Sequence, residues 1–298
     1  MDAFVHIKLK SWLICILLLS SFVSEGQFRK YSNEFMNIGA GARGLAMGGA
    51  QVATTEDAYA GFWNPAGLSE LKTHSSYSLM HAEYFAGIGK YDYLSAATPI
   101  GDPARATMGL GISLLRFAVD DIPNTLYLVA PDGSINYNNI QSFSSADYAL
   151  LISFGQTLYS DSKQNFSFGT NAKIIHRSVG KFAKAWGIGL DAGLQYRSKK
   201  LSFGLVLKDI TTTYNAWKFS FTDREKEMLY LSRNEIPIKS VELTAPRMFI
   251  GAAYNTDLNN RFSFMSELNF ELSFDGRRNV LLSSNAFNLD PRIGIELN

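Results

Sequence analysis

Apolar and polar residues alternate with a period of two along several stretches of the chain. The clearest stretch is 186–197, where apolar residues at even positions are separated by glycine or polar residues. The pattern recurs at 106–114, 166–174, 248–254, 262–274 and 293–297. Successive side chains of a strand point to opposite faces, so the pattern predicts strands with one apolar face. Runs of about ten residues match tilted membrane strands better than the shorter strands of soluble proteins.

Alternation alone does not say which face meets lipid, because a soluble β-sandwich buries the same apolar stripe. Two features favour a membrane β-barrel. The polar stripe is rich in glycine and carries charges of both signs, which suits a crowded lumen. Short and long connections also alternate, as in outer-membrane barrels. Short turns are predicted at 101–103, 160–165, 198–200, 255–260 and 288–291, and very long connections at 118–146 and 212–245.

The end of the chain affects the expected closure of the barrel. We count about eleven strand candidates from residue 75 onward, of which 77–84, 91–99 and 279–287 are the weakest. The last stretch, 293–297, still alternates where the sequence stops. Bacterial single-chain barrels have an even number of strands and no free edge. We therefore expect this chain to lack the last strands, and its first and last strands not to pair.

The N-terminus has the features of an export signal. Lys8 and Lys10 precede an apolar run at 12–23, and Ser24 and Gly26 are small residues at the −3 and −1 positions before Gln27. The run is shorter than the ~20 residues of a membrane helix. Residues 1–26 are therefore predicted to be a Sec signal peptide. Cys15, the single cysteine, lies within it, so the mature chain has no disulfide and a bacterial envelope is favoured.

Between the signal and the first strand, the chain is rich in small residues and does not alternate. We predict that residues 27–73 form a plug inside the barrel of residues 74–298, with Trp63 and Pro65 buried. Asp57 or Asn64 is expected to begin a turn, and Arg43 to pair with Asp57 or a lumen carboxylate. The structural plug positions are Gly39, Gly41, Arg43, Gly44, Gly48, Gly49, Asp57, Trp63, Asn64, Pro65, Ala66 and Gly67.

Three of these glycines also spell a dinucleotide-binding fingerprint, Gly39-x-Gly41-x-x-Gly44. Such a site needs a strand directly before it and a βαβ unit around it. Only a few apolar residues precede Gly39, and the rest of the chain is predicted to be β. Close packing of the plug is therefore the favoured interpretation.

The sequence of the plug resembles that of a known family. Gly-Ala-Arg-Gly-Leu-Ala-Met-Gly-Gly-Ala at 41–50, Asp57-Ala58 and Trp-Asn-Pro-Ala-Gly-Leu at 63–68 resemble the N-terminal signature of the PorV/PorQ family. These proteins are FadL-like outer-membrane barrels of Bacteroidetes associated with type IX secretion. The resemblance covers residues 29–72, and the barrel agrees in pattern only. It implies a full fold of 14 strands, and as partners secreted cargo C-terminal domains, the translocon and a surface attachment complex.

Other sequence features exclude several functions. The near balance of 28 Lys and Arg against 27 Asp and Glu gives no field that would attract nucleic acid. The four histidines lack metal-ligand spacing and no nucleophile elbow occurs, so no enzyme activity, metal or cofactor is expected. Asp120 and Asp121 are expected in a solvated external loop. Residues 223–232 are predicted to form a short helix, either solvated or a partner-docking surface.

Two functions remain. The first is an outer-membrane protein of the PorV/PorQ type that holds or shuttles secreted cargo. The second is a FadL-like channel for hydrophobic small molecules. In both, Trp186, Ile188, Leu190, Leu194 and Tyr196 face outer-membrane lipid. A continuous apolar pocket through the lumen would favour the channel. The polar lumen stripe favours cargo handling: Asp191, Gln195, Arg197, Glu267, Asn269 and Glu271.

Overall fold

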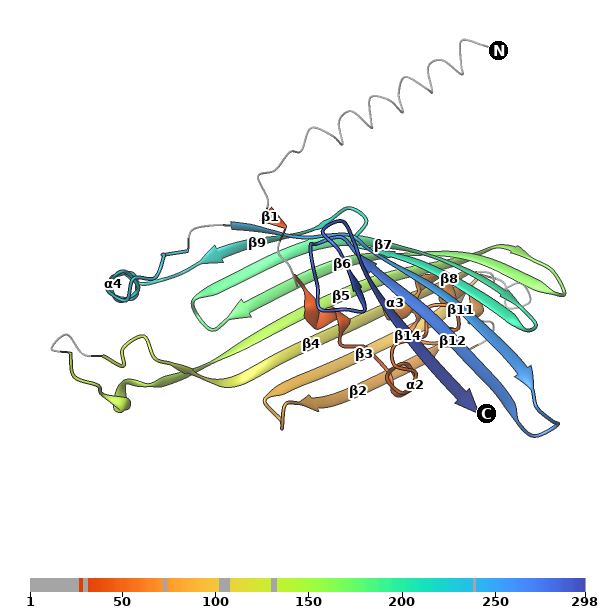
Figure 1. The fold of residues 1–298 in the computed structure, drawn as a ribbon, viewed down its shortest axis with the longest axis horizontal. Coiled ribbons are helices and arrows are strands. Elements are labelled where there is room, and N and C mark those ends of the chain that lie inside the picture. The colour runs from red at the N-terminus through yellow and green to blue at the C-terminus, as the bar shows by residue number, and fades with distance from the viewer. Residues whose placement is uncertain are drawn as a thin grey trace, which may run out of the picture.

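The computed structural model describes residues 27–28, 32–71, 74–101, 108–129, 133–237 and 240–297. The predicted signal peptide and most of the predicted turn at 101–103 lie outside these residues. The described residues form one curved 14-stranded sheet around an N-terminal segment (Figure 1). The sheet is antiparallel except where β1 (Gln27–Phe28) pairs parallel to β10 (Ser240–Thr244). The predicted all-β, antiparallel and barrel-like architecture is therefore confirmed.

The first half of the sheet consists of long neighbouring strands that follow one another in sequence. They are β2 (Ser76–Tyr84), β3 (Gly89–Ile100), β4 (Met108–Asn124), β5 (Gln141–Ser160), β6 (Gln164–Val179) and β7 (Ala183–Ser198). The second half contains shorter pieces. They are β8 (Leu201–Lys208), β9 (Thr213–Phe219), β10, β11 (Arg247–Asp257), β12 (Ser263–Ser273), β13 (Leu282–Ser283) and β14 (Asn288–Leu297).

Strands β8 and β9 together correspond to one long strand interrupted by a bend, and so do β10 and β11. Strand β8 pairs with one half of β7 and β9 with the other half, so together they follow its whole length. At the bend between them, Asp209 and Thr212 adopt a φ of 58°. Strands β10 and β11 continue the same arrangement, with β10 on β9 and β11 on β8. The predicted long connection at 212–245 is therefore corrected in part, because it contains two strands, β9 and β10, beside helix α4 (Asp223–Leu231).

Three further expectations are corrected. The predicted connection at 118–146 shortens to 125–140, because the β4–β5 ladder continues past an irregularity between Val119 and Ile122. Asp120 and Asp121 therefore lie in β4 and not in a loop. The predicted turn at 288–291 lies inside β14, and the predicted strand at 279–287 shrinks to β13. Pro291 is tolerated there because edge strands can spare a donor. Turns at 161–163 and 199–200 match the prediction, and the turn at 258–262 overlaps the predicted 255–260, whose first residues belong to β11.

The sheet does not close within the described residues. Strand β2 pairs only with β3, and β14 pairs with β12 and β13, so no ladder joins β2 to β14. The expectation that the first and last strands do not pair is confirmed for these residues.

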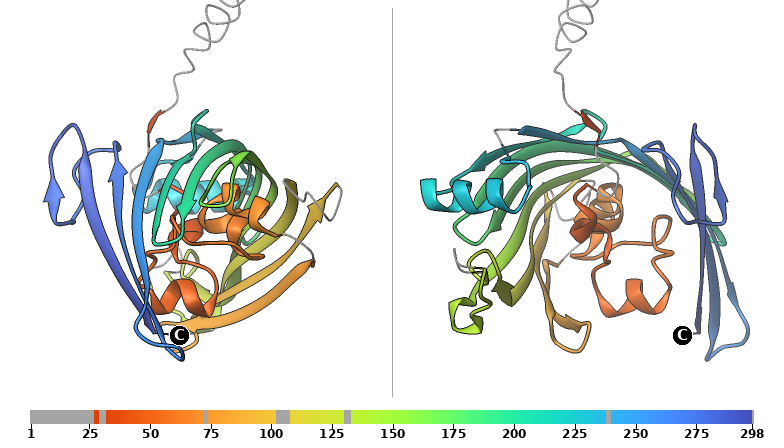
Figure 2. Two further views of the ribbon diagram at one scale, coloured as in Figure 1. Left: turned by 90° about the vertical axis from the view of Figure 1, so that its right-hand side faces the viewer. Right: turned by 60° about the vertical axis from the view of Figure 1, so that its left-hand side comes forward.

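The inner segment, residues 32–71, lies in the concave side of the sheet (Figure 2). It contains η1 (Glu34–Asn37), α2 (Ala42–Ala46), α3 (Ala60–Trp63) and η2 (Pro65–Glu70). Trp63 and Pro65 are buried, as predicted. An apolar cluster joins this segment to the sheet and is made of Phe35, Phe62 and Trp63 with Tyr91, Tyr93, Leu115, Leu151 and Ile175.

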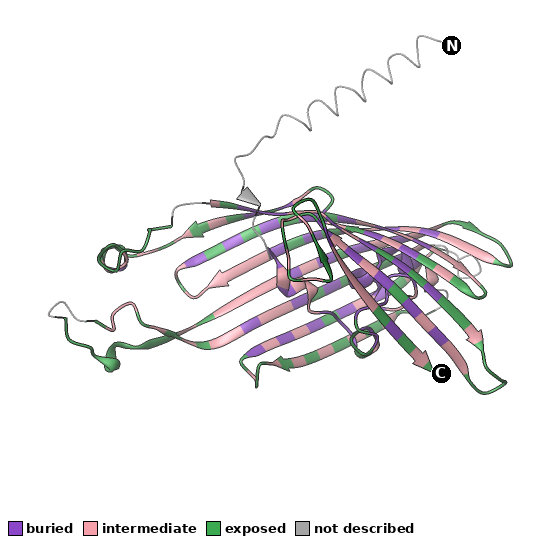
Figure 3. Ribbon diagram, in the orientation of Figure 1, coloured by how far each residue is buried: buried purple, intermediate pink, exposed green. Residues whose placement is uncertain are grey.

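Burial alternates along the strands, as Figure 3 shows by colour. On β7, Trp186 and Ile188 are 62% and 67% exposed, whereas Asp191 and Gln195 are buried against the inner segment. The apolar stripe therefore lies on the convex side and the polar stripe on the concave side, as the barrel interpretation predicted. Within the described residues, no helix is long and apolar enough to cross a membrane.

Candidate functional site

The convex face carries continuous transverse rows of apolar side chains, because the register aligns them across neighbouring strands. One row comprises Leu79, Leu94, Leu114, Leu150, Ile174, Ile188 and Tyr214. The next row toward the β7–β8 turn comprises Tyr77, Ala96, Ile112, Ile152, Ala172 and Leu190. Most of the large side chains in both rows are exposed. Soluble monomers rarely expose an apolar surface of this extent.

Polar and aromatic side chains bound this apolar band toward the long connections. Here Asp92 accepts hydrogen bonds from His81 (2.7 Å) and Arg116 (2.8 Å). In the same row, His176 lies between the rings of Tyr148 and Trp186, with centroids 6.4 and 4.3 Å away. His81 and His176 thus both face the convex side.

Aromatic side chains also bound the band toward the short turns, where the rings of Tyr196 and Phe203 lie 6.2 Å apart. Trp186 and Tyr196 are ten positions apart on β7. At about 3.3 Å per residue and a tilt of about 40°, this separation gives a band about 25 Å high. Outer-membrane barrels have an apolar band of the same height between two aromatic girdles.

On the concave face, four glycines form a transverse row that we call the glycine track: Gly109, Gly155, Gly169 and Gly193. Helix η2 lies directly against this track. A Cβ on Gly169 would lie 2.3 Å from the backbone nitrogen of Ala66, and one on Gly109 2.2 Å from the Leu68 carbonyl oxygen. The glycines in the polar stripe therefore give the inner segment room to contact the backbone of the sheet.

Asn64 fixes the start of η2 on this track. Its Oδ1 accepts from the N–H of Ala66 (3.1 Å), which is the turn predicted at this position. Its Nδ2 donates to the carbonyls of Val52 (2.8 Å) and Leu194 in β7 (3.0 Å). One buried amide thus joins the turn, the inner segment and the sheet, while Pro65 supplies the fixed φ of the first residue of η2.

The other predicted plug positions have specific structural roles. Gly39, Gly41, Gly48 and Gly49 all adopt positive φ, which other residues adopt only with strain. Gly44 and Gly67 are needed for space: a Cβ would lie 2.7 Å from the Trp63 indole at Gly44, and 2.3 Å from the Thr55 carbonyl oxygen at Gly67.

Trp63 and Asp57 stabilise turns of the inner segment. The Trp63 indole donates to the Ala40 carbonyl (2.9 Å), and Asp57 accepts from the Tyr59 N–H (2.8 Å), at the second predicted turn. The dinucleotide-binding interpretation is excluded, because the 3-10 helix η1, not a strand, precedes Gly39 and an antiparallel sheet follows.

The C-terminal strands hold the inner segment through charge. We call Arg43, Glu296 and Glu267 the charged clamp. Arg43 pairs with Glu296 of β14 at 2.9 Å, which is the lumen carboxylate option of the prediction. Glu267 of β12 accepts from the N–H of Ala53 (2.8 Å) and the hydroxyl of Thr54 (2.5 Å). Since Gly41 also donates to Met80 of β2 (3.2 Å), the region around α2 contacts both β2 and β14, which do not pair with each other.

The bend between β8 and β9 is fixed by buried ion pairs. Lys173 pairs with Asp191 (2.7 Å) and with Asp209, and each of these side chains is at most 6% exposed. Asp191 also accepts from the Asp209 N–H (2.8 Å), and Thr213 donates to the Asp209 carboxylate (2.5 Å). A buried charge is stable only when paired and hydrogen-bonded, which is met here. The cluster therefore has a structural role.

The contact between the inner segment and the sheet is tightly filled. Two cavities flank Phe62 and Lys208, and each has a volume of about 10 Å³. That volume accommodates about one water molecule. A third hollow of about 190 Å³ is lined mainly by polar and charged groups, including Glu34, Glu271 and Arg278. Neither of the two cavities beside Phe62 has room for a hydrophobic solute, and the third hollow is polar.

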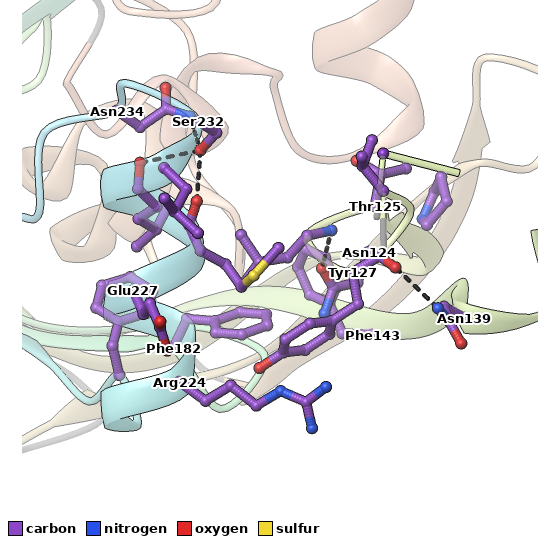
Figure 4. A pocket seen from close by; sticks show the side chains of 18 residues that line it. Asn124, Thr125, Tyr127, Asn139, Phe143, Phe182, Arg224, Glu227, Ser232 and Asn234 are labelled. Atoms are coloured by element: carbon purple, nitrogen blue, oxygen red, sulfur yellow. Dashed lines mark hydrogen bonds between the residues drawn. The ribbon is translucent and has the colours of Figure 1, made fainter. Parts of the chain in front are cut away.

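A larger pocket of about 970 Å³ lies between helix α4 and the β4–β5 connection (Figure 4). Its apolar lining includes Tyr127, Phe143, Phe182, Phe221 and Met228. The guanidinium of Arg224 lies over the Tyr127 ring at 5.0 Å. Volume and lining are typical of pockets for small molecules or peptide side chains. We call this site the loop pocket.

Helix α4, predicted at 223–232, is confirmed and forms one wall of the loop pocket. Thr222 and Glu225 form a capping box at its start. Glu225 also pairs with Lys181 in the β6–β7 turn at 2.8 Å. Burial raises the pKa of Glu225, but the Lys181 ammonium and the Thr222 hydrogen bonds outweigh it and hold the pKa below its usual value. This ion pair attaches helix α4 to the β6–β7 turn of the sheet.

Sequence reasoning missed the glycine track and the loop pocket. The sequence shows only that each of four strands has a glycine at a position expected to face inward. That these glycines lie side by side follows from the register of the strands, which the sequence does not give. The pocket had no sequence signal, because its rings come from separate connections. In the described part of the chain, no group of three His, Cys, Asp or Glu side chains could hold a metal ion. No protein-family model matches the chain, and the search of curated proteins found no match.

Proposed function

We propose that the chain is an integral outer-membrane protein whose convex face contacts lipid and whose inner segment acts as a plug. The exposed apolar rows and the aromatic residues at both limits of the band support this proposal. Charges on that face cost about 2–4 kcal/mol near the bilayer midplane. The two central rows contain none. Export to the outer membrane would depend on residues 1–26.

Within this setting, we favour cargo handling of the PorV/PorQ type over transport. Cargo C-terminal domains and components of the type IX translocon or attachment complex are the proposed partners. The observation that carries the choice is the close contact at the glycine track, where a Cβ on any of the four glycines would lie 2.2–2.6 Å from an atom of the inner segment. A hydrophobic solute has no room to pass there. The loop pocket offers a docking site at the opposite end of the molecule from the short turns.

The alternative is a FadL-like channel for hydrophobic small molecules. One observation favours it, namely that the loop pocket is aromatic and has the volume of a small-molecule site. The two functions differ in what must follow binding. A channel must move the plug and open a path, whereas a cargo-handling protein keeps the path closed.

Two measurements test the proposal. In planar bilayers, we expect the wild-type protein to be closed and a variant lacking residues 32–71 to conduct ions. Proteins co-purifying from outer membranes should be lost from Phe182→Ser with Arg224→Glu and retained by Lys199→Glu, a control in the β7–β8 turn. Conductance or solute flux through the wild-type protein, with no co-purifying proteins, would favour the channel.

A further inference from the structure

Two lysines lie directly opposite each other on the convex face. Lys184 of β7 and Lys218 of β9 are register partners, and both are exposed. Together with Gly180, Lys181 and Ser220 they line a hollow of about 610 Å³. We call Lys184 and Lys218 the lysine pair.

This arrangement is unfavourable within the protein itself. Like charges directly opposite each other in an antiparallel ladder destabilise the sheet. Lys181 is neutralised by Glu225 at 2.8 Å. Neither member of the lysine pair has an acidic partner within ion-pair distance among the described residues. The register neighbour of Lys184 on β6 is Ser178, which carries no charge. The hollow therefore has uncompensated positive charge.

The position of the pair relative to the apolar band identifies what can compensate it. Lys184 lies two residues beyond Trp186, on the side of the band that faces the long connections. Trp186 belongs to the aromatic row with Tyr148 and His176. In membrane proteins, aromatic rings at this level mark the headgroup region, and neighbouring lysines extend into it. Lysine binds phosphate as a compact charge.

The geometry points to a lipid-binding site: the lysine pair holds the phosphate of an anionic lipid headgroup, one with no cationic group of its own, in the leaflet next to the long connections. The inference rests on the proposed function, because only a chain in a bilayer places a headgroup there. The lipid phosphate lies between the two ammonium groups and replaces their repulsion by two attractions.

The test compares the wild-type protein with Lys184→Gln/Lys218→Gln, in vesicles of phosphatidylcholine with or without phosphatidylglycerol. Lys199→Gln/Lys200→Gln, at the opposite limit of the band, is the matched control. We expect the folded wild-type protein to retain phosphatidylglycerol over phosphatidylcholine in native mass spectrometry. At roughly fivefold per lysine, the enrichment is about 25-fold, and the lysine-pair variant loses it while the control keeps it.

A second readout separates this role from simple loss of structure. In pure phosphatidylcholine, the lysine-pair variant should melt at the same temperature as the wild type or higher, because repulsion is relieved. Only the wild type and the control should gain stability from phosphatidylglycerol. Equal destabilisation of the variant in both lipids would overturn the site. So would equal stabilisation of the wild type by inorganic phosphate in neutral vesicles, because the ligand would then be free phosphate.

Failure of the proposed function would look different. If no variant folds into either kind of vesicle, judged by heat-modifiable mobility on gels, both the membrane location and the lipid site are wrong. If all variants fold equally and none enriches phosphatidylglycerol, only the lipid site is wrong.

Discussion

The inner segment contacts the two halves of the sheet in different ways. Against β4–β7 it lies on the glycine track, where a Cβ would lie 2.2–2.6 Å from backbone atoms of η2 or from the Asn64 side chain. Against β12 and β14 it is held by the charged clamp, through named side chains at 2.5–3.1 Å. The first contact depends on side chains being absent, and the second on their identity. Substitutions at the two contacts should therefore fail for opposite reasons.

The largest effect is expected on the glycine track. Gly169→Val places a branched side chain 2.3 Å from the Ala66 nitrogen, with rigid backbone on both sides. Overpacking of this kind costs about 1–3 kcal/mol, and we expect the upper end. The melting temperature in detergent should fall, and protease should cut within residues 32–71. Ala172→Val, an outward change on the same strand, is the control. A stable, resistant Gly169→Val protein would show that the inner segment does not need this contact.

The second largest loss of stability is expected at Glu267, the buried carboxylate of the charged clamp. Glu267→Ala removes the acceptor of the Ala53 N–H and the Thr54 hydroxyl. Leaving buried donors without a partner costs about 1–3 kcal/mol. Glu267→Gln keeps an amide oxygen and should recover part of this loss. If both variants melt alike, the hydrogen bonds from the inner segment contribute nothing measurable.

The half-buried ion pair of the clamp, Arg43 with Glu296, should contribute less to the free energy of unfolding. The Arg43 and Glu296 side chains are 33% and 24% exposed. A double-mutant cycle of Arg43→Ala and Glu296→Ala should give a coupling of at most about 1 kcal/mol. Raising the salt concentration should shrink the coupling further. A coupling that is large and insensitive to salt would mean that this pair is as protected as Glu267.

The smallest effect concerns pH. Burial raises the pKa of Asp57 above its usual value of 3.8. The folded state then binds a proton more readily than the unfolded state, so this contribution favours folding at low pH and is lost as pH rises through the raised pKa. Asp57→Asn keeps the acceptor for the Tyr59 N–H and should flatten stability between pH 4 and 7. An unchanged pH profile would contradict the assignment to Asp57.

Local patterns predicted most strands, but not where they break. Alternation from Trp186 to Tyr196 predicts the strand and places its apolar side chains on one face, because a period of two has one geometric solution. The outward direction of that face followed from the barrel interpretation and not from the alternation. The bend at Asp209 depends on Asp191 and Lys173 of neighbouring strands, and no local signal indicates it. Asn288 to Pro291 reads as a turn, but at the edge of the sheet those residues continue a strand.

The candidate site was predicted in part for similar reasons. Small residues and Asn64-Pro65 indicated close packing and a turn, and both are present. The sequence predicted that Arg43 pairs with Asp57 or with a carboxylate of the lumen. It could not identify Glu296 as that carboxylate, because Glu296 is 253 positions away. The loop pocket combines rings from separate connections, so its recognition required coordinates.

The glycine track also has a consequence for the order of assembly. The inner segment contacts the strands of the glycine track across shorter sequence separations than the strands of the clamp. The hydrogen bonds of Asn171 to Gly61 and of Asn64 to Leu194 span 110 and 130 positions. Those of Ala53 to Glu267 and of Arg43 to Glu296 span 214 and 253 positions. Closing shorter loops costs less entropy and is faster. Strands β4–β7 should therefore form around the inner segment before β12 and β14 arrive. In that order of events, β4–β7 assemble on the inner segment, and the contacts of the charged clamp form last.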